Sequence, residues 1–241
     1  MIAIFTDFGV RGPYLGQMHA VLAERAPGVP VVDVFPDLPA FNRKAAAYLL
    51  PAYSQYLPLA AVCLCVVDPG VGSDRRPVAV KADGRWYVGP DNGIFSILVR
   101  RARRVEVLLL RAAPQRLSAT FHGRDLFAPV AAQLARGDAP DAVGVACEAL
   151  VSPDWPAELA EVVYMDSYGN ALTGLRAATL GHEAELAVAG RVCRFRRTFA
   201  DAEPGEVFWY ENANGLVELA MNQGSAADAL NLGVATPVQL R

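Results

Sequence analysis

Two short segments place carboxylate, guanidinium and imidazole groups beside glycines, a combination suited to acid, base and electrostatic catalysis. Residues 68–76 have the sequence DPGVGSDRR, which holds Asp68 and Arg75 in one glycine-rich turn. Residues 120–125 have the sequence TFHGRD and include His122, one of 3 histidines in the chain. A single histidine is more often structural, but His122 stands beside Gly, Arg and Asp just before an expected helix. Its neighbours therefore favour a functional interpretation.

Two further segments, residues 6–9 (TDFG) and 89–93 (GPDNG), also follow expected strands. Each has a structural interpretation as well, because Asp7 is a suitable turn or helix cap and residues 89–93 suit a turn and helix N-cap. Gly70 and Gly72 are not followed by the third glycine of the dinucleotide-binding fingerprint, and no P-loop is present. The histidines lack metal-ligand spacing. We therefore expect neither a metal nor a cofactor.

The four polar segments come at strand ends, where α/β proteins bind ligands. Apolar runs rich in β-branched residues alternate with helical patterns, which predicts an α/β domain with a mostly parallel sheet. Asp83-Gly84 predicts a two-residue hairpin turn. The expected strands are residues 2–6, 31–35, 61–67, 77–81, 85–88 and 105–110, and the expected helices are residues 14–25, 43–56, 92–101 and 126–136.

Two breaker clusters, residues 137–140 (GDAP) and 152–156 (SPDWP), precede a change of pattern. Beyond them, short strands separated by Gly, Asn and Pro predict a small antiparallel β-barrel or sandwich. These strands are expected at residues 162–166, 185–188, 191–196, 207–210 and 216–220. The sequence thus predicts an N-terminal α/β domain over residues 1–150 and a C-terminal β-barrel domain over residues 157–241.

The composition describes a chain that can bury a sizeable core. Of 241 residues, 53% are hydrophobic and 20% are charged, which excludes disordered and disulfide-scaffold proteins. The net charge of −3 gives no general attraction to phosphate backbones, so we expect no nucleic-acid partner. No apolar run is long enough to cross a bilayer, and the N-terminus shows no secretory signal. We expect a cytoplasmic protein with reduced cysteines and no membrane partner.

Taken together, these motifs resemble the S-adenosyl-L-methionine hydroxide adenosyltransferases, a family long known as a domain of unknown function and related to fluorinating and chlorinating enzymes. The resemblance covers the whole chain. The N-terminal matches are TDFG at 6–9 with Tyr14 and Gly16-x-Met18, VVDPGVG at 66–72 with Arg75-Arg76, PDNG at 90–93, and TFHGRD-x-FAP at 120–129. The C-terminal matches are D-x-YGN at 166–170 with Thr173, N-x-NG at 212–215 with Glu218-x-Ala220, and G-x-AA at 224–227.

The resemblance implies a large α/β domain joined to a small β-barrel, in a homotrimer with its active sites at subunit interfaces. Each site then lies between the N-terminal domain of one subunit and the C-terminal domain of the next. The implied reaction is attack of water or hydroxide at C5′ of S-adenosyl-L-methionine, giving adenosine and L-methionine. The sulfonium compound is the substrate, with no separate cofactor.

Position by position, the resemblance places the catalytic Asp, Arg and His of the family on Asp68, Arg75 and His122. Water activation then falls to His122 as a base or to the positive charge of Arg75, which Asp68 holds in place. For the ribose, the resemblance implies that Asp7 binds the hydroxyl groups and that Phe121 and Gly123 line the pocket for ribose and nucleophile. For adenine, it implies stacking by Tyr168 and a contact of Asn170 with the edge of the base. For methionine, it implies that Asp166 faces the amino group and that the turn of Asn212, Ala213 and Asn214 faces the carboxylate.

The chain departs from the family pattern at Gly12, at the pairs His19-Ala20 and Val34-Phe35, and at Ala213. They surround the first and last loops of the expected pocket, so a change in substrate affinity or choice stays open. Two alternatives to hydrolysis also stay open, a non-catalytic S-adenosylmethionine- or adenosine-binding protein and a halide-using member of the superfamily. A histidine adjacent to Gly123 suits water better than a halide.

Overall fold

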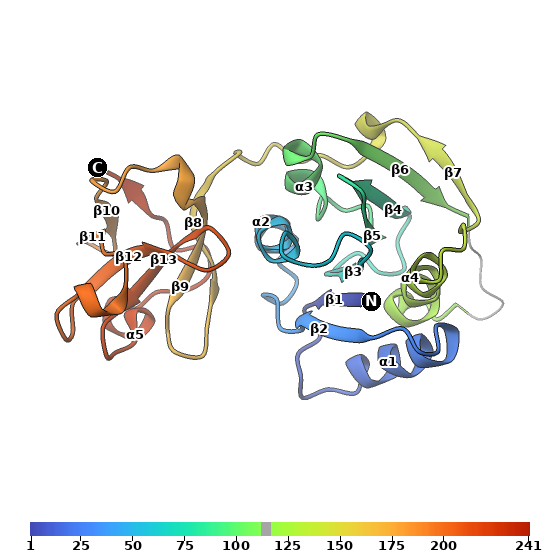
Figure 1. The fold of residues 1–241 in the computed structure, drawn as a ribbon, viewed down its shortest axis with the longest axis horizontal. Helices are drawn as coiled ribbons and strands as arrows, with labels where there is room; N and C mark the ends of the chain where they lie inside the picture. The colour runs from blue at the N-terminus through green and yellow to red at the C-terminus, as the bar shows by residue number, and fades with distance from the viewer. Residues whose placement is uncertain (112–116) are drawn as a thin grey trace. The chain divides into compact units, whose positions relative to one another are not determined.

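The computed structural model describes residues 1–111 and 117–241. They divide into two compact units, Met1–Asp154 and Trp155–Arg241, which are described separately (Figure 1). Among these residues, no helix has both the length and the apolar character needed to cross a membrane.

The first unit is built on a seven-stranded mixed sheet in the order β2-β1-β3-β5-β4-β6-β7. Its strands are β1 (Ile2–Thr6), β2 (Val31–Phe35), β3 (Val62–Val66), β4 (Pro77–Ala82), β5 (Arg85–Pro90), β6 (Val105–Leu110) and β7 (Ala142–Val145). Strands β2, β1, β3 and β5 are parallel, and the remaining neighbours pair in antiparallel fashion. Every residue of β1 and β3 is buried, as in strands covered on both faces. The predicted α/β class is confirmed.

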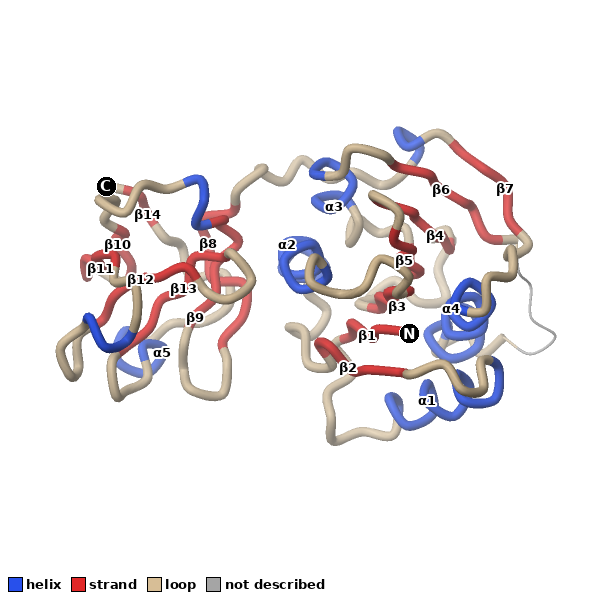
Figure 2. The backbone as a smooth tube through the Cα atoms, in the orientation of Figure 1, coloured by secondary structure: helices blue, strands red, loops and turns tan. Residues whose placement is uncertain are grey.

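Helices pack on both faces of this sheet (Figure 2). The helix α1 (Tyr14–Arg25) contacts α4 (Ala128–Ala135) and the π-helical turn η1 (Gly123–Phe127), and α2 (Arg43–Ser54) contacts α3 (Ser96–Arg101). The apolar face of α1 forms one core with the central strands because its buried residues recur at helical spacing. Asn42 caps α2, with its side chain accepting a hydrogen bond from the backbone N–H of Ala45.

The expected elements differ from the structure mainly at their ends. The helix expected at residues 92–101 begins at Ser96, because the Asn92 side chain accepts a hydrogen bond from the Ile94 N–H and holds a turn there. The predicted hairpin turn is present, with Asp83 and Gly84 at φ values of 46° and 94° between β4 and β5.

The second unit is a seven-stranded sheet in the order β14-β10-β11-β12-β13-β9-β8. Its elements are β8 (Leu159–Met165), β9 (Ala171–Arg176), β10 (Leu186–Val188), β11 (Arg191–Phe195), β12 (Val207–Glu211), β13 (Leu216–Met221), α5 (Ala226–Leu230) and β14 (Gln239–Leu240). A bridge between Glu161 and Pro237 joins β8 to the segment before β14, which closes the sheet toward a barrel. All pairs are antiparallel except β11 with β12.

Candidate active site

The polar segments of the first unit meet at one edge of its sheet. Asp7 and Asp68 follow the parallel strands β1 and β3, and Arg75 precedes β4, which runs in the opposite direction and so begins at the same edge. His122 is the N-cap residue of η1. Single π-helical turns are frequent at functional sites because they re-aim side chains locally.

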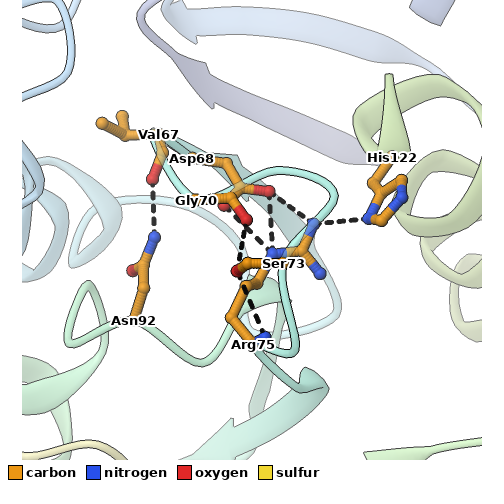
Figure 3. A network of polar contacts seen from close by, with 7 residues as sticks. All are labelled: Val67, Asp68, Gly70, Ser73, Arg75, Asn92 and His122. Atoms are coloured by element: carbon orange, nitrogen blue, oxygen red, sulfur yellow. Dashed lines mark hydrogen bonds and ion pairs between the residues drawn. The ribbon is translucent and has the colours of Figure 1, made fainter. Parts of the chain in front are cut away.

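Asp68, Arg75 and His122 form one hydrogen-bonded chain (Figure 3). The Nε of Arg75 donates to Oδ1 and Oδ2 of Asp68 at 3.0 and 2.9 Å, and its Nη2 donates to Oδ2 at 2.5 Å. The same Nη2 lies 2.6 Å from Nδ1 of His122. Asp68 and Arg75 are largely buried, so this pair is shielded from solvent. The structure therefore brings the three predicted catalytic residues together.

The contact with Arg75 fixes the tautomer of His122. A guanidinium only donates hydrogen bonds, so Nδ1 of His122 must be the acceptor and the ring proton resides on Nε2. Burial and the positive charge of Arg75 lower the pKa of His122, while Asp68 and Asp125 oppose that shift. His122 is thus a neutral ring that presents an N–H group rather than a free lone pair.

The turn that carries Asp68 is held by its neighbours. The Ser73 hydroxyl donates to the Gly70 carbonyl at 2.7 Å, and the Asn92 amide donates to the Val67 carbonyl at 2.9 Å. Asp91 accepts hydrogen bonds from the Val151 N–H and from Arg76. The segment 89–93 therefore has the structural role that its sequence allowed.

Asp7 lies beside this network and is half-buried. Its Oδ2 accepts the N–H of Phe41 at 2.8 Å. Burial, with a smaller contribution from the charge of Asp68, raises the pKa of Asp7. Phe41 has a φ of 61° and is 75% exposed, so the residue whose N–H binds Asp7 has a left-handed backbone conformation. Phe41 was not foreseen from the sequence, because it lies in a loop that meets Asp7 34 positions away along the chain.

Aromatic rings form the wall beside His122. Phe121 is buried and contacts Phe8 and Tyr14 in edge arrangements, with ring centroids 5.7 and 5.3 Å away. Gly123 packs under them, where an added Cβ would lie 3.3 Å from Phe8 and 3.4 Å from Phe121. Phe121 and Gly123 thus pack together with Phe8 and Tyr14 next to His122 in the chain.

The second unit contains a cavity of about 680 Å³. Its lining residues are Asp166, Tyr168, Asn170, Phe199, Tyr210, Glu218, Met221, Gln223 and Gly224. Asp166 accepts hydrogen bonds from the backbone N–H groups of Tyr168 and Asn170 and from the Asn170 amide, so it shapes the β8–β9 turn. Tyr168 lines the cavity and is 79% exposed as a residue, a position suited to stacking.

The turn at residues 212–214 lies outside this lining. Asn212 is buried, and its Oδ1 accepts the N–H groups of Asn214 and Leu216 at 2.9 and 3.0 Å. Its amide donates to Glu218, so Asn212 shapes the turn, while Ala213 is exposed. The cavity residues Phe199, Tyr210, Met221 and Gln223 were not foreseen. The alternation of side chains along β12 and β13 could have indicated part of this cavity, because the even-numbered side chains of these strands face away from the main barrel core.

Within the described ranges, no group of three or more His, Cys, Asp or Glu side chains is arranged to hold a metal ion. The site is instead an acidic, basic and aromatic surface.

Comparison with known proteins places this geometry in a family. A model of the SAM hydroxide adenosyltransferase N-terminal domain matches residues 2–144, and one of its C-terminal domain matches residues 160–239. The chain is 44% identical to a Thermus thermophilus protein named (R)-S-adenosyl-L-methionine hydrolase, over 99% of this chain and 98% of that one. It is 25% identical to a fluorinase of Actinopolyspora mzabensis, over 96% and 94%. A solved Thermotoga maritima structure described as an uncharacterized conserved protein superposes with a TM-score of 0.91 at 25% identity and full coverage of both chains.

Proposed function

This chain belongs to the SAM hydroxide adenosyltransferase family, and we propose that it hydrolyses S-adenosyl-L-methionine to adenosine and L-methionine. The observation that carries the proposal is the continuous chain of hydrogen bonds from Asp68 through Arg75 to His122. Identity to a hydrolase from Thermus thermophilus over nearly the full length supports the same reaction.

The proposed reaction is an in-line displacement. The oxygen of water forms a bond to C5′, the bond between C5′ and sulfur breaks, and the electron pair stays on the sulfur of methionine. One proton is released from the attacking water. Because the leaving group is a neutral thioether, it needs no general acid, and the protein has only to position and activate the water.

Arg75 is the group that we assign to water activation. Its Nε and Nη2 hydrogens are directed to Asp68 and His122, so the two hydrogens on Nη1 are the ones left for a ligand. A fixed positive charge with free donors stabilises hydroxide over water. His122, with Nδ1 occupied by Arg75, donates from Nε2 and orients the nucleophile rather than accepting its proton.

The remaining contacts complete the substrate pose. We assign the ribose hydroxyls to Asp7, and the pocket around ribose and nucleophile to Phe121 and Gly123. Tyr168 stacks on adenine and Asn170 bonds its edge.

The methionine part of the substrate is assigned to the rest of the second unit. Asp166 faces the amino group, and the turn of Asn212, Ala213 and Asn214 faces the carboxylate. From the resemblance to the family, we further propose a homotrimer with each active site shared between neighbouring subunits. A cytoplasmic location stays a prediction from the sequence.

The experiment that tests the function uses purified protein and S-adenosyl-L-methionine in halide-free water labelled with oxygen-18, with mass spectrometry of the products. We expect adenosine carrying the label at its 5′ oxygen and equimolar L-methionine. The variant R75Q serves as the inactive control. Adenosine without label, or a halogenated nucleoside formed only after chloride is added, would contradict direct hydrolysis. Binding of the substrate with no turnover would identify a binding protein instead.

A further inference from the structure

Glu218 is a buried carboxylate on the outer face of the barrel. It lies on β13 directly opposite Tyr210 on β12, in a row of side chains that points away from the main core. Only 5% of its surface is exposed. It lines a cavity with Phe199 and Tyr210, whose rings contact each other and Phe208. A glutamate on an outward-facing position would ordinarily remain in water, so its burial requires a reason.

Each carboxyl oxygen of Glu218 has a hydrogen-bond partner. The Tyr210 hydroxyl donates to Oε1 at 2.5 Å, and the Asn212 amide donates to Oε2 at 2.8 Å. Both partners are neutral, so they satisfy the oxygens without cancelling the charge. The pKa of Glu218 is raised, chiefly by burial and also by the charge of Asp166, while the two hydrogen bonds oppose that shift.

The charge of Glu218 is not balanced inside the cavity. Among residues 1–111 and 117–241, the lining contains the carboxylates of Asp166 and Glu218 and no Lys, Arg or His. The other lining groups include the aromatic rings of Tyr168, Phe199 and Tyr210, and aromatic faces attract cations. A cavity of this kind favours a ligand that carries positive charge over a neutral one of the same shape.

We propose that Glu218 is a specificity-determining residue that makes the protein prefer the cationic sulfonium substrate over neutral thioether nucleosides. The proposal rests on the proposed function, and it extends it to a distinction between substrate and products. S-Adenosyl-L-methionine carries one net positive charge, whereas adenosine is neutral and methionine has no net charge. The negative cavity therefore holds the substrate and releases both products.

The test compares two ligands that the protein does not hydrolyse. Sinefungin has an ammonium group in place of the sulfonium, and S-adenosylhomocysteine has a neutral thioether. Isothermal titration calorimetry on the full chain gives the ratio of their dissociation constants. We expect the wild type to prefer sinefungin by tenfold or more, and E218Q to lose about tenfold of that preference, the order expected for one charge in a protein pocket.

Two further variants separate charge from structure. Y210F removes a hydrogen bond to Glu218 but keeps its charge, so we expect the preference to be retained. Q223K adds a cation to the exposed rim of the cavity without changing the hydrogen-bond partners of Glu218. The preference for sinefungin should therefore fall in Q223K as it does in E218Q, so the test does not depend on E218Q folding well. Equal weakening of both ligands in E218Q, or an unchanged ratio in Q223K, would overturn the proposal. If the wild type binds both ligands equally but hydrolyses the substrate, the role of Glu218 is overturned and the proposed function stands. If the wild type binds neither ligand and does not hydrolyse the substrate, the proposed function is overturned as well.

Discussion

Gly72 packs against the carbonyl oxygen of Ala119, at a distance that leaves no room for a side chain. A Cβ atom on Gly72 would lie 2.7 Å from that oxygen, and Gly72 has a φ of 82°. Gly72 belongs to the turn between Asp68 and Arg75, and Ala119 comes shortly before His122. This close backbone contact therefore sets the distance between the two segments that Arg75 and His122 must bridge.

The variant G72A should lower kcat by about tenfold or more, because the turn must shift away from Ala119 and stretch the bond from Arg75 to His122. It should also lose stability by about 1–2 kcal/mol from backbone strain. G84A is the matched control, since Gly84 has a φ of 94° but open space around it, in a turn remote from the site. Steady-state kinetics and urea unfolding of both variants check this. Equal activity of the two variants would show that the contact does not position Arg75.

Substitutions of His122 distinguish a donor from a base. The amide nitrogen of glutamine occupies roughly the position of Nε2, whereas the amide of asparagine occupies that of Nδ1. If His122 donates to the nucleophile, H122Q should retain kcat within about tenfold, while H122N and H122A should lose about 100-fold or more. Single-turnover rates with circular dichroism as a folding control give the comparison. Complete inactivity of H122Q together with H122A would instead favour the general base.

The pKa of His122 should be measurably below its ordinary value of 6.5. Neutral His122 is favoured by burial and by Arg75, so its contribution to stability is fully present above pH 6.5, decreases as the pH falls below 6.5, and is lost once the pH has passed the lower folded value. Its contribution to turnover is lost as the pH falls through the folded value. NMR titration of the 3 histidine rings, with H122N to assign one of them, measures this directly.

The same titration in R75Q should move the pKa of His122 upward, toward its ordinary value, because a positive neighbour is removed. R104Q, on a distant loop, should leave it unchanged. A value at or above 6.5 in the wild type would contradict the tautomer assigned from the structure.

Local signals in the sequence were sufficient for much of this architecture. The buried strand β3, the turn at Asp83-Gly84 and the polar segments at strand ends follow from nearest-neighbour chemistry. What the sequence could not provide depends on contacts between distant residues. Arg75 and His122 are 47 positions apart, and only the fold shows that Arg75 occupies Nδ1 and removes the lone pair that a base would need.

The elements that were missed have the same cause. Strand β9 contains Gly174 and follows a turn, so its sequence lacks a strong strand pattern. Pairing with β8 and β13 on its two sides nevertheless makes it an interior strand of the sheet. Phe41 entered the site only through its bond to Asp7, 34 positions away.

The last prediction concerns Asp7, whose raised pKa is a cost to stability. Its folded carboxyl group protonates more readily than the unfolded one, so the ionised form destabilises the fold as the pH rises through the folded value. D7N keeps an oxygen that accepts the Phe41 N–H but removes the buried charge. At pH 7, D7N should therefore melt at a higher temperature than the wild type, and this gain in melting temperature should shrink at pH values below 3.8, the ordinary pKa of an aspartate.

Because a carboxylate binds hydroxyl groups more strongly than an amide does, D7N should also bind adenosine about tenfold or more weakly. D91N is the matched control, since Asp91 is paired with Arg76, and its neutralisation should lower the melting temperature. Calorimetric melting at pH 7 and at about pH 3, with adenosine titrations at pH 7, tests both halves. A D7N variant that is less stable yet binds adenosine normally would assign Asp7 to the loop of Phe41 rather than to the ribose.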